Sequence, residues 1–71
     1  MLRLSKLTDY ATVLLTYMAK TNGQLHTAME LSEVTAIHLP TVSKVLKVLS
    51  KEGLVYAIRG SKGGYQLAQA L

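Results

Sequence analysis

The sequence predicts a mainly α-helical domain with a small β-hairpin, in which three helices precede two short strands. Apolar residues recur at helical spacing in three successive stretches up to Lys51. After Gly53 the pattern changes to two β-branched and aromatic runs that a glycine-rich segment separates. The chain has 71 residues with four Tyr and neither Phe nor Trp, so residues 1–71 are expected to form one domain around a single aliphatic core.

The first helix is expected over residues 5–20. Its apolar stripe, at i, i+3, i+4 and i+7 spacing, consists of Leu7, Tyr10, Ala11, Leu14, Tyr17 and Met18. Ser5 or Thr8 offers an oxygen that would cap the start of this helix. The Thr-Asn-Gly sequence at residues 21–23 has the turn chemistry that ends a helix, and residues 24–26 follow as a short link with one extended pairing.

A second, short helix is expected over residues 28–34. The residues from Thr27 to Glu30 match a capping box, in which the Thr27 oxygen accepts from the N–H three residues on and the Glu30 carboxylate reaches back to the Thr27 N–H. Leu31 and Val34 are expected to face the core. Residues 35–37 then form a tight turn that buries its last side chain.

The stretch LPTVSKVLKVLSKEG, residues 39–53, predicts a third helix with two different faces. An apolar stripe contains Val42, Val45, Leu46 and Leu49, and a polar stripe contains Thr41, Lys44, Lys47 and Lys51, interrupted only by Val48. Pro40 suits the first turn of a helix, and Gly53 suits the left-handed position after its last turn. One face is therefore expected to pack on the core while the other presents three lysines to an anionic partner.

Two short helices joined by a tight turn form a helix-turn-helix, although a plain αα-hairpin in a small helical domain has the same pattern. Residues 54–59 and 65–68 predict the strands of a hairpin, with Tyr65 and Leu67 on one face. Residues 60–64 form its glycine-rich turn, with Arg59 and Lys62 at or beside the tip. A helix-turn-helix followed by a basic hairpin is the order of a winged helix, and the glycines allow its tip to approach a nucleic-acid backbone closely.

The net charge of +4 lies entirely in the second half of the chain. Residues 1–35 carry three basic and three acidic side chains, whereas residues 36–71 carry five basic side chains and one acidic. This asymmetry favours a polyanionic partner. A basic surface that only maintains solubility is the alternative explanation.

No pattern in the sequence indicates catalysis, a metal site or a membrane segment. The chain has no cysteine, which excludes disulfides and thiolate metal sites. His26 and His38 are isolated, with no carboxylate or nucleophile at a spacing that would pair with them in a helix, and two histidines alone make no metal site. No apolar run is long enough for a signal peptide or a membrane span, so we expect a cytoplasmic protein that is not an enzyme.

Three segments cover nearly the whole chain: RLSKLTDYA at residues 3–11, LPTVSKVLKVLSKEGLV at residues 39–55 and RGSKGGYQLA at residues 59–68. Together they resemble the N-terminal winged-helix domain of the Rrf2 family of bacterial transcription regulators, which includes IscR- and NsrR-like proteins. The RG-x-x-GGY-x-LA pattern is the most specific part. The opening and the third helix are most similar to the branch that regulates the SUF iron–sulfur assembly operon.

The resemblance implies a DNA-binding repressor or activator that is a homodimer in its full-length form. By position, Pro40, Thr41, Ser43 and Lys44 would touch bases in the major groove, Arg59 matches the wing arginine in the minor groove, and Gly63, Gly64 and Tyr65 match the wing turn. Family members that sense iron–sulfur status carry three cysteines and a long dimerisation helix beyond the winged helix. This chain has no cysteine and ends at Leu71. We therefore expect no cofactor in this chain, and a truncated product or a fragment of a longer protein.

The chemistry of the individual side chains indicates which part of the DNA each residue would contact. Thr41, Ser43 and Lys44 are expected to read base edges. Phosphate contacts are expected from Thr27, Lys47, Lys51 and Lys62. The wing contacts in the minor groove are expected from Arg59, Gly60, Ser61, Gly63 and Gly64, with Arg59 the main one. The expected function is sequence-specific regulation of SUF-type iron–sulfur assembly genes.

Two other classes of function stay open, a winged-helix protein-interaction module without DNA binding and a small enzyme. An RNA-binding role fits less well, because no exposed aromatic set for base stacking is evident.

Overall fold

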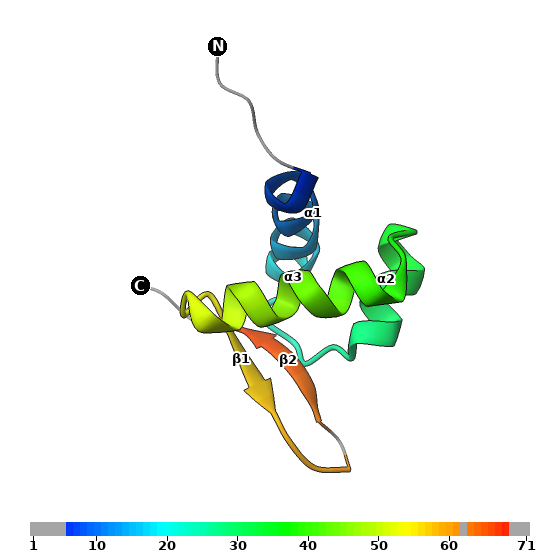
Figure 1. Ribbon diagram of the computed structural model, residues 1–71. Helices are drawn as coiled ribbons and strands as arrows, with labels where there is room; N and C mark the ends of the chain where they lie inside the picture. Colours follow the sequence, from blue (N-terminus) through cyan, green and yellow to red (C-terminus); the bar gives the residue numbers. More distant parts are fainter. Residues whose placement is uncertain (1–5, 62, 69–71) are drawn as a thin grey trace.

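The helical spacing and the strand-forming runs of the sequence produce three helices and a two-stranded antiparallel sheet, in the order α1, α2, α3, β1, β2 (Figure 1). The elements are α1 (Lys6–Lys20), α2 (Ala28–Thr35), α3 (Leu39–Lys51), β1 (Val55–Ile58) and β2 (Gly64–Leu67). The computed structural model describes residues 6–61 and 63–68. This arrangement confirms the predicted fold class, a winged helix-turn-helix.

The core forms where the apolar stripes of the helices meet β1. Its buried residues are Leu14, Met18, Leu31, Val42, Val45, Leu46, Leu49 and Val55. The four residues predicted as the apolar stripe of α3 are all among them, which confirms that assignment. Burying a Leu or Val side chain stabilises a fold by about 1.5–3 kcal/mol, so α3 is held firmly from one side. Lys44, Lys47 and Lys51 on its other side are exposed.

Two helices end in the way that their turn residues predict. After α1, the N–H of Gly23 donates to Met18 O at 3.2 Å, and Asn22 adopts a left-handed φ of 59°. After α3, the N–H of Leu54 donates to Leu49 O at 2.8 Å, and Gly53 has a φ of 82°. Both ends close with the Schellman pattern, in which a left-handed residue lets the chain satisfy the last carbonyls of the helix. The proposed cap Ser5 lies outside the described residues.

The structure corrects two predictions for α2. Thr27 caps this helix as expected, because its Oγ1 accepts from the Glu30 N–H at 3.0 Å. The Glu30 carboxylate, however, pairs with His26 and does not return to the Thr27 N–H, so only half of the capping box forms. Val34 is 49% exposed, and the prediction that it faces the core was wrong. Val34 and Val13 line a hollow of about 430 Å³ between α1 and α2, and both side chains are nearly half exposed there.

The turn between α2 and α3 is fixed by local hydrogen bonds. Ser32 Oγ donates to Ile37 O at 2.5 Å, and Thr35 Oγ1 donates to Leu31 O at 2.6 Å. Ala36 takes a left-handed φ of 60°, which reverses the chain within this short connection. Ile37 is half-buried and packs against the core, close to its predicted position.

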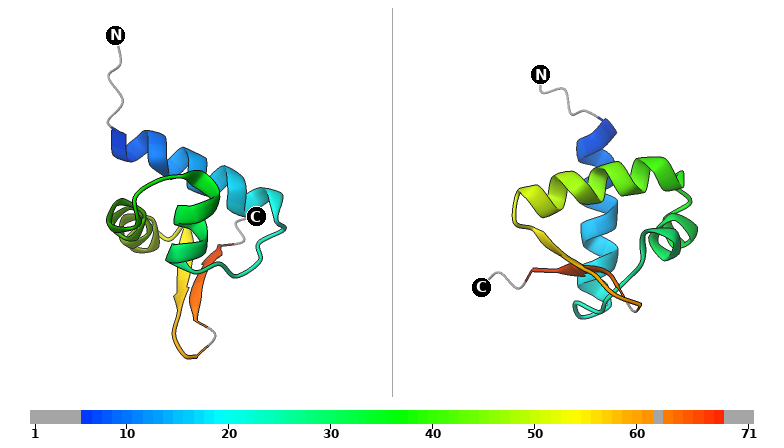
Figure 2. Two further views of the ribbon diagram at one scale, coloured as in Figure 1. Left: turned by 90° about the vertical axis from the view of Figure 1, so that its right-hand side faces the viewer. Right: turned by 60° about the horizontal axis from the view of Figure 1, so that its bottom comes forward.

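The hairpin, or wing, consists of β1, β2 and the turn that joins them. Val55 pairs with Leu67 and Ala57 pairs with Tyr65, which places these side chains on one face of the sheet. Tyr65 and Leu67 lie on one face, as predicted, and from that face they pack against the core. Strand β1 begins one residue later and ends one residue earlier than predicted, and β2 is shifted by one residue toward the N-terminus. The wing projects away from the helices, as the left view of Figure 2 shows.

The wing is also attached to the link between α1 and α2. His26 and Tyr65 form a single antiparallel bridge, which is the one extended pairing expected for residues 24–26. A Cβ atom on Gly64 would lie only 2.5 Å from His26 O, so this close approach requires glycine. Gln66 Nε2 donates to Gly23 O at 3.0 Å and adds a second attachment.

Candidate nucleic-acid interface

The exposed face of α3 is the first part of the candidate interface. Lys44, Lys47 and Lys51 are all exposed, and they lie on the side of the helix opposite its buried stripe. Val48, 36% exposed, interrupts this basic face as predicted. Among the described parts of the chain, no carboxylate forms an ion pair with any of the three lysines. Their charge is therefore available to an anion outside the chain.

The N-terminal half of α3 carries the residues predicted to read bases. Pro40 and Lys44 are exposed, whereas Thr41 and Ser43 are half-buried. Pro40 occupies the first turn of the helix, as the sequence predicts. The residue before α3 is His38, which is exposed and makes no side-chain hydrogen bond to the helix. This end of α3 therefore presents uncapped backbone N–H groups and the positive end of the helix dipole.

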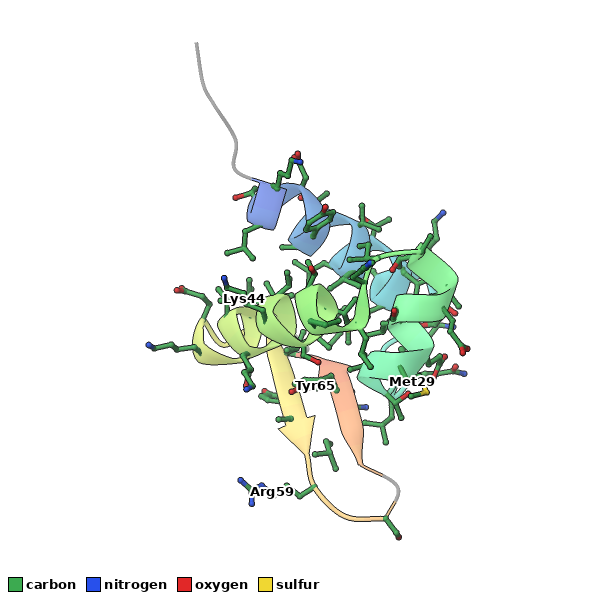
Figure 3. All side chains as sticks on the ribbon, turned by 45° about the vertical axis from the view of Figure 1, so that its right-hand side comes forward. Met29, Lys44, Arg59 and Tyr65 are labelled. Atoms are coloured by element: carbon green, nitrogen blue, oxygen red, sulfur yellow. The ribbon has the colours of Figure 1, made fainter. Side chains whose placement is uncertain are left out.

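The wing tip is the second part of the candidate interface. Arg59, Gly60 and Ser61 are exposed, and Gly63 and Gly64 are half-buried. The Gly63 N–H donates to Gly60 O at 2.9 Å and closes the turn. Figure 3 shows the Arg59 side chain extending outward from the end of β1. The predicted phosphate contact Lys62 lies outside the described residues.

Thr27, the remaining predicted phosphate contact, lies at the first turn of α2. It is exposed, and its Oγ1 accepts from the Glu30 N–H, so its hydroxyl proton stays free to donate. A Cβ on Gly64 would lie 3.3 Å from Thr27 N, which places Thr27 beside the start of β2. The structure thus gathers the α3 residues on one face, leaves the wing-tip residues on a separate projection, and sets Thr27 at the base of that projection.

The structure also contains a polar cluster that the sequence reasoning missed. His26 is only 3% exposed, and its Nδ1 lies 2.6 Å from Glu30 Oε2 while its Nε2 lies 2.8 Å from Thr21 Oγ1. The prediction that His26 is isolated was therefore wrong. It considered pairs within one helix, whereas His26 precedes α2 and its partners come from the turn after α1 and from the first turn of α2. The available signal was the four-residue spacing from His26 to Glu30.

The described residues contain no cluster of three or more His, Cys, Asp or Glu side chains with the geometry to hold a metal ion. None of the helices in residues 6–61 is both long and apolar enough to cross a membrane.

Comparisons with known proteins agree with the fold. The model of the Rrf2 family, described as an iron-dependent transcriptional regulator, matches residues 4–71. A protein of Aquifex aeolicus, described as a "Putative HTH-type transcriptional regulator", is 38% identical over 60 residues, which are 84% of this chain and 42% of that protein. The crystal structure of a similarly described transcriptional regulator from Lactobacillus plantarum superposes with a TM-score of 0.73 at 25% identity, over 92% of this chain and 44% of that one.

The chain spans less than half the length of both relatives. The family and both of these proteins are described as transcriptional regulators. Because the family model covers almost all of the sequence, the chain belongs to the Rrf2 family of transcriptional regulators.

Proposed function

We propose that this chain binds duplex DNA, with α3 in the major groove and the wing in the minor groove. The observation that supports the proposal most strongly is the division of α3 into a fully buried apolar face and an exposed face with three lysines. A helix of this kind fits the major groove of B-form DNA when the rest of the domain supports it from behind. The family's description as a transcriptional regulator agrees with this partner.

Within this proposal the α3 residues have two roles. Thr41, Ser43 and Lys44 lie in the N-terminal half of the helix and contact base edges, where Lys44 donates to the acceptors of guanine. Pro40 contacts bases through its exposed ring. Lys47 and Lys51 lie further along the helix and neutralise phosphates, which raises affinity without reading sequence.

The wing supplies the contacts in the minor groove. Arg59 extends away from the sheet (Figure 3) and enters the narrow groove of A·T-rich DNA, whose negative potential attracts guanidinium groups. Gly60, Ser61, Gly63 and Gly64 follow the backbone at the tip. Phosphate contacts are assigned to Thr27 and Lys62 as well.

The genes that we propose for this regulator are those of SUF-type iron–sulfur cluster assembly. The similarity of residues 3–11 and 39–55 to that branch of the family supports this assignment. We propose a homodimer for the longer, full-length form. This chain contains no cysteine, so its own residues offer no thiolate to an iron–sulfur cluster.

An amide NMR titration with a duplex of about 25 base pairs, repeated at higher salt, tests DNA binding residue by residue and tolerates the weak affinity of about 10⁻⁴–10⁻⁶ M typical of non-specific complexes. We expect shifts concentrated on residues 41–51 and 59–64 that fade as salt rises. Absence of shifts, or shifts confined to α1, would contradict the proposal. The second result would favour a protein-interaction role.

A further inference from the structure

Val48 is an apolar side chain on the otherwise polar and basic face of α3. It lies four residues after Lys44 and three before Lys51, a spacing that sets the three side chains next to one another on the surface of the helix. Val48 is 36% exposed, whereas its chain neighbour Leu49 is 4% exposed and belongs to the core. The valine therefore presents apolar surface among the charges that would meet DNA.

Val48 contributes less to packing than the buried residues of α3 and nothing to the charge of the exposed face. Its branched Cβ also lowers helix propensity slightly, because it restricts rotation about χ1 in a helix. Single exposed apolar residues are common on protein surfaces, so exposure alone indicates no role. The informative observation is the position of Val48 between Lys44 and Lys51 on the helix proposed to enter the major groove.

The restricted rotation of Val48 favours a contact with a ligand. Valine in a helix has one strongly preferred rotamer, and α3 itself is fixed by Val45, Leu46 and Leu49 in the core. Val48 therefore holds its two methyl groups in a defined place before any contact forms, and ordering this side chain costs little entropy. The neighbouring lysines are long, and they lose more rotamers when they are held in one geometry.

We propose that Val48 is a specificity-determining residue that packs against the 5-methyl group of a thymine in the major groove. The inference rests on the DNA-binding function proposed above. Base edges in this groove carry hydrogen-bond donors and acceptors, and the thymine methyl is the apolar group among them. A valine pressed against a donor or acceptor displaces its water without replacing the hydrogen bond, whereas contact with a methyl group removes two apolar surfaces from water. Lys44 and Lys51 attract α3 to DNA by charge, and Val48 then favours sequences that place a thymine beneath it.

The test removes the apolar contact from the DNA and from the protein separately. The probe is the duplex that the wild type selects from a random library, in which each thymine is exchanged in turn for uracil. Uracil lacks only the 5-methyl group, so base pairing, phosphates and the minor-groove edge proposed for Arg59 stay the same. Val48→Ala removes the contact on the protein. Val13→Ala is the matched control, since Val13 is an exposed valine on α1.

Affinities are measured by fluorescence anisotropy with the labelled duplexes. At one thymine, the exchange should lower the affinity of the wild type and of Val13→Ala about fourfold, the effect of returning one methyl group to water. The same exchange should leave the affinity of Val48→Ala nearly unchanged, because the contact is already absent. A merely structural role of Val48 would weaken binding to both duplexes alike. Val48→Ala should also keep the wild-type dependence on salt, because a methyl contact releases no counterions.

Three results would overturn the inference. They are a wild-type affinity that no exchange lowers, losses in Val48→Ala equal to those of the wild type at every thymine, and an equal loss of discrimination in Val13→Ala. Selection that enriches no sequence, or a sequence without thymine, would contradict it as well. So would affinity gained only when cytosines are exchanged for 5-methylcytosine, which carries the same methyl group.

Failure of the wild type to bind duplex at any salt concentration would contradict the proposed function itself. Binding that does not discriminate between thymine and uracil leaves that function standing and overturns this inference alone.

Discussion

Removal of a single lysine from the exposed face of α3 should change the salt dependence of DNA binding by a predictable amount. Lys47 is exposed, and its neighbours in the core, Leu46 and Leu49, point to the opposite side of the helix. Lys47→Ala should therefore leave the free energy of unfolding within about 0.5 kcal/mol of the wild type. Any loss of affinity then reports the contact with DNA.

The magnitude follows from the number of lysines that we assign to phosphates. Each lysine–phosphate contact adds about 0.9 to the slope of log affinity against log salt, so Lys47, Lys51 and Lys62 together give a slope of about 2.7. Between about 50 and 200 mM salt the wild type should lose about 40-fold in affinity, whereas Lys47→Ala should lose only about 12-fold. The loss caused by Lys47→Ala should be similar for all duplex sequences, because phosphates carry no sequence information.

Fluorescence anisotropy with a labelled duplex at several salt concentrations measures both slopes. Lys20→Ala is the matched control, since Lys20 is an exposed lysine on α1, where it lines the hollow toward α2. This control should keep the wild-type slope. A slope for Lys47→Ala equal to that of the wild type, or an equal reduction for Lys20→Ala, would refute the assignment of α3 as the DNA-contacting helix.

Three further predictions concern sequence preference and stability. Lys44→Ala should relax the preference at one base pair while other positions are still discriminated, as measured by selection from a random duplex library; unchanged preference would contradict its base-reading role. Arg59→Ala should lose the preference for duplexes with A·T-rich flanks, and equal affinity losses for A·T-rich and G·C-rich flanks would show that Arg59 acts only on phosphates. Leu46→Ala leaves a cavity at a fully buried site and should lower the free energy of unfolding by about 3 kcal/mol, as measured by urea unfolding. Val34→Ala, at a half-exposed site, should lower it by less than about 1 kcal/mol.

Regular elements with strong local signals could be predicted from the sequence. The two stripes of α3 occupy more than three turns, so the periodicity alone assigned Val42, Val45 and Leu46 to the core. Gly53 marked the end of the same helix, because the left-handed position that closes a Schellman motif favours glycine. In the same way, the alternation of Tyr65 and Leu67 placed both on one face of the wing, and the structure packs that face on the core.

The errors occurred where neighbours from other elements decide the outcome. Helix α2 has only eight residues. The spacing of its few apolar residues could not show that Val34 borders a hollow next to α1. The pairing of Glu30 with His26 depends on the turn that brings Thr21 close, and on the bridge to Tyr65, a residue far along the chain. Helical spacing contains no information about such contacts. Among the candidate DNA-contacting residues, Lys44, Lys47 and Lys51 are exposed whereas Thr41 and Ser43 are half-buried, and their contacts with DNA stay predictions.

The strict separation of the two faces of α3 has a consequence for how regulators of this kind diverge. Substitutions on the exposed face touch no core residue, and surface changes of this type usually alter stability by less than about 0.5 kcal/mol. Selection can therefore change the operator that the helix recognises without first compensating a loss of fold stability. Duplicated copies of such a domain can acquire different target genes through a few exposed positions such as Lys44. Changes at Val45 or Leu46, in contrast, would be removed by selection in every copy.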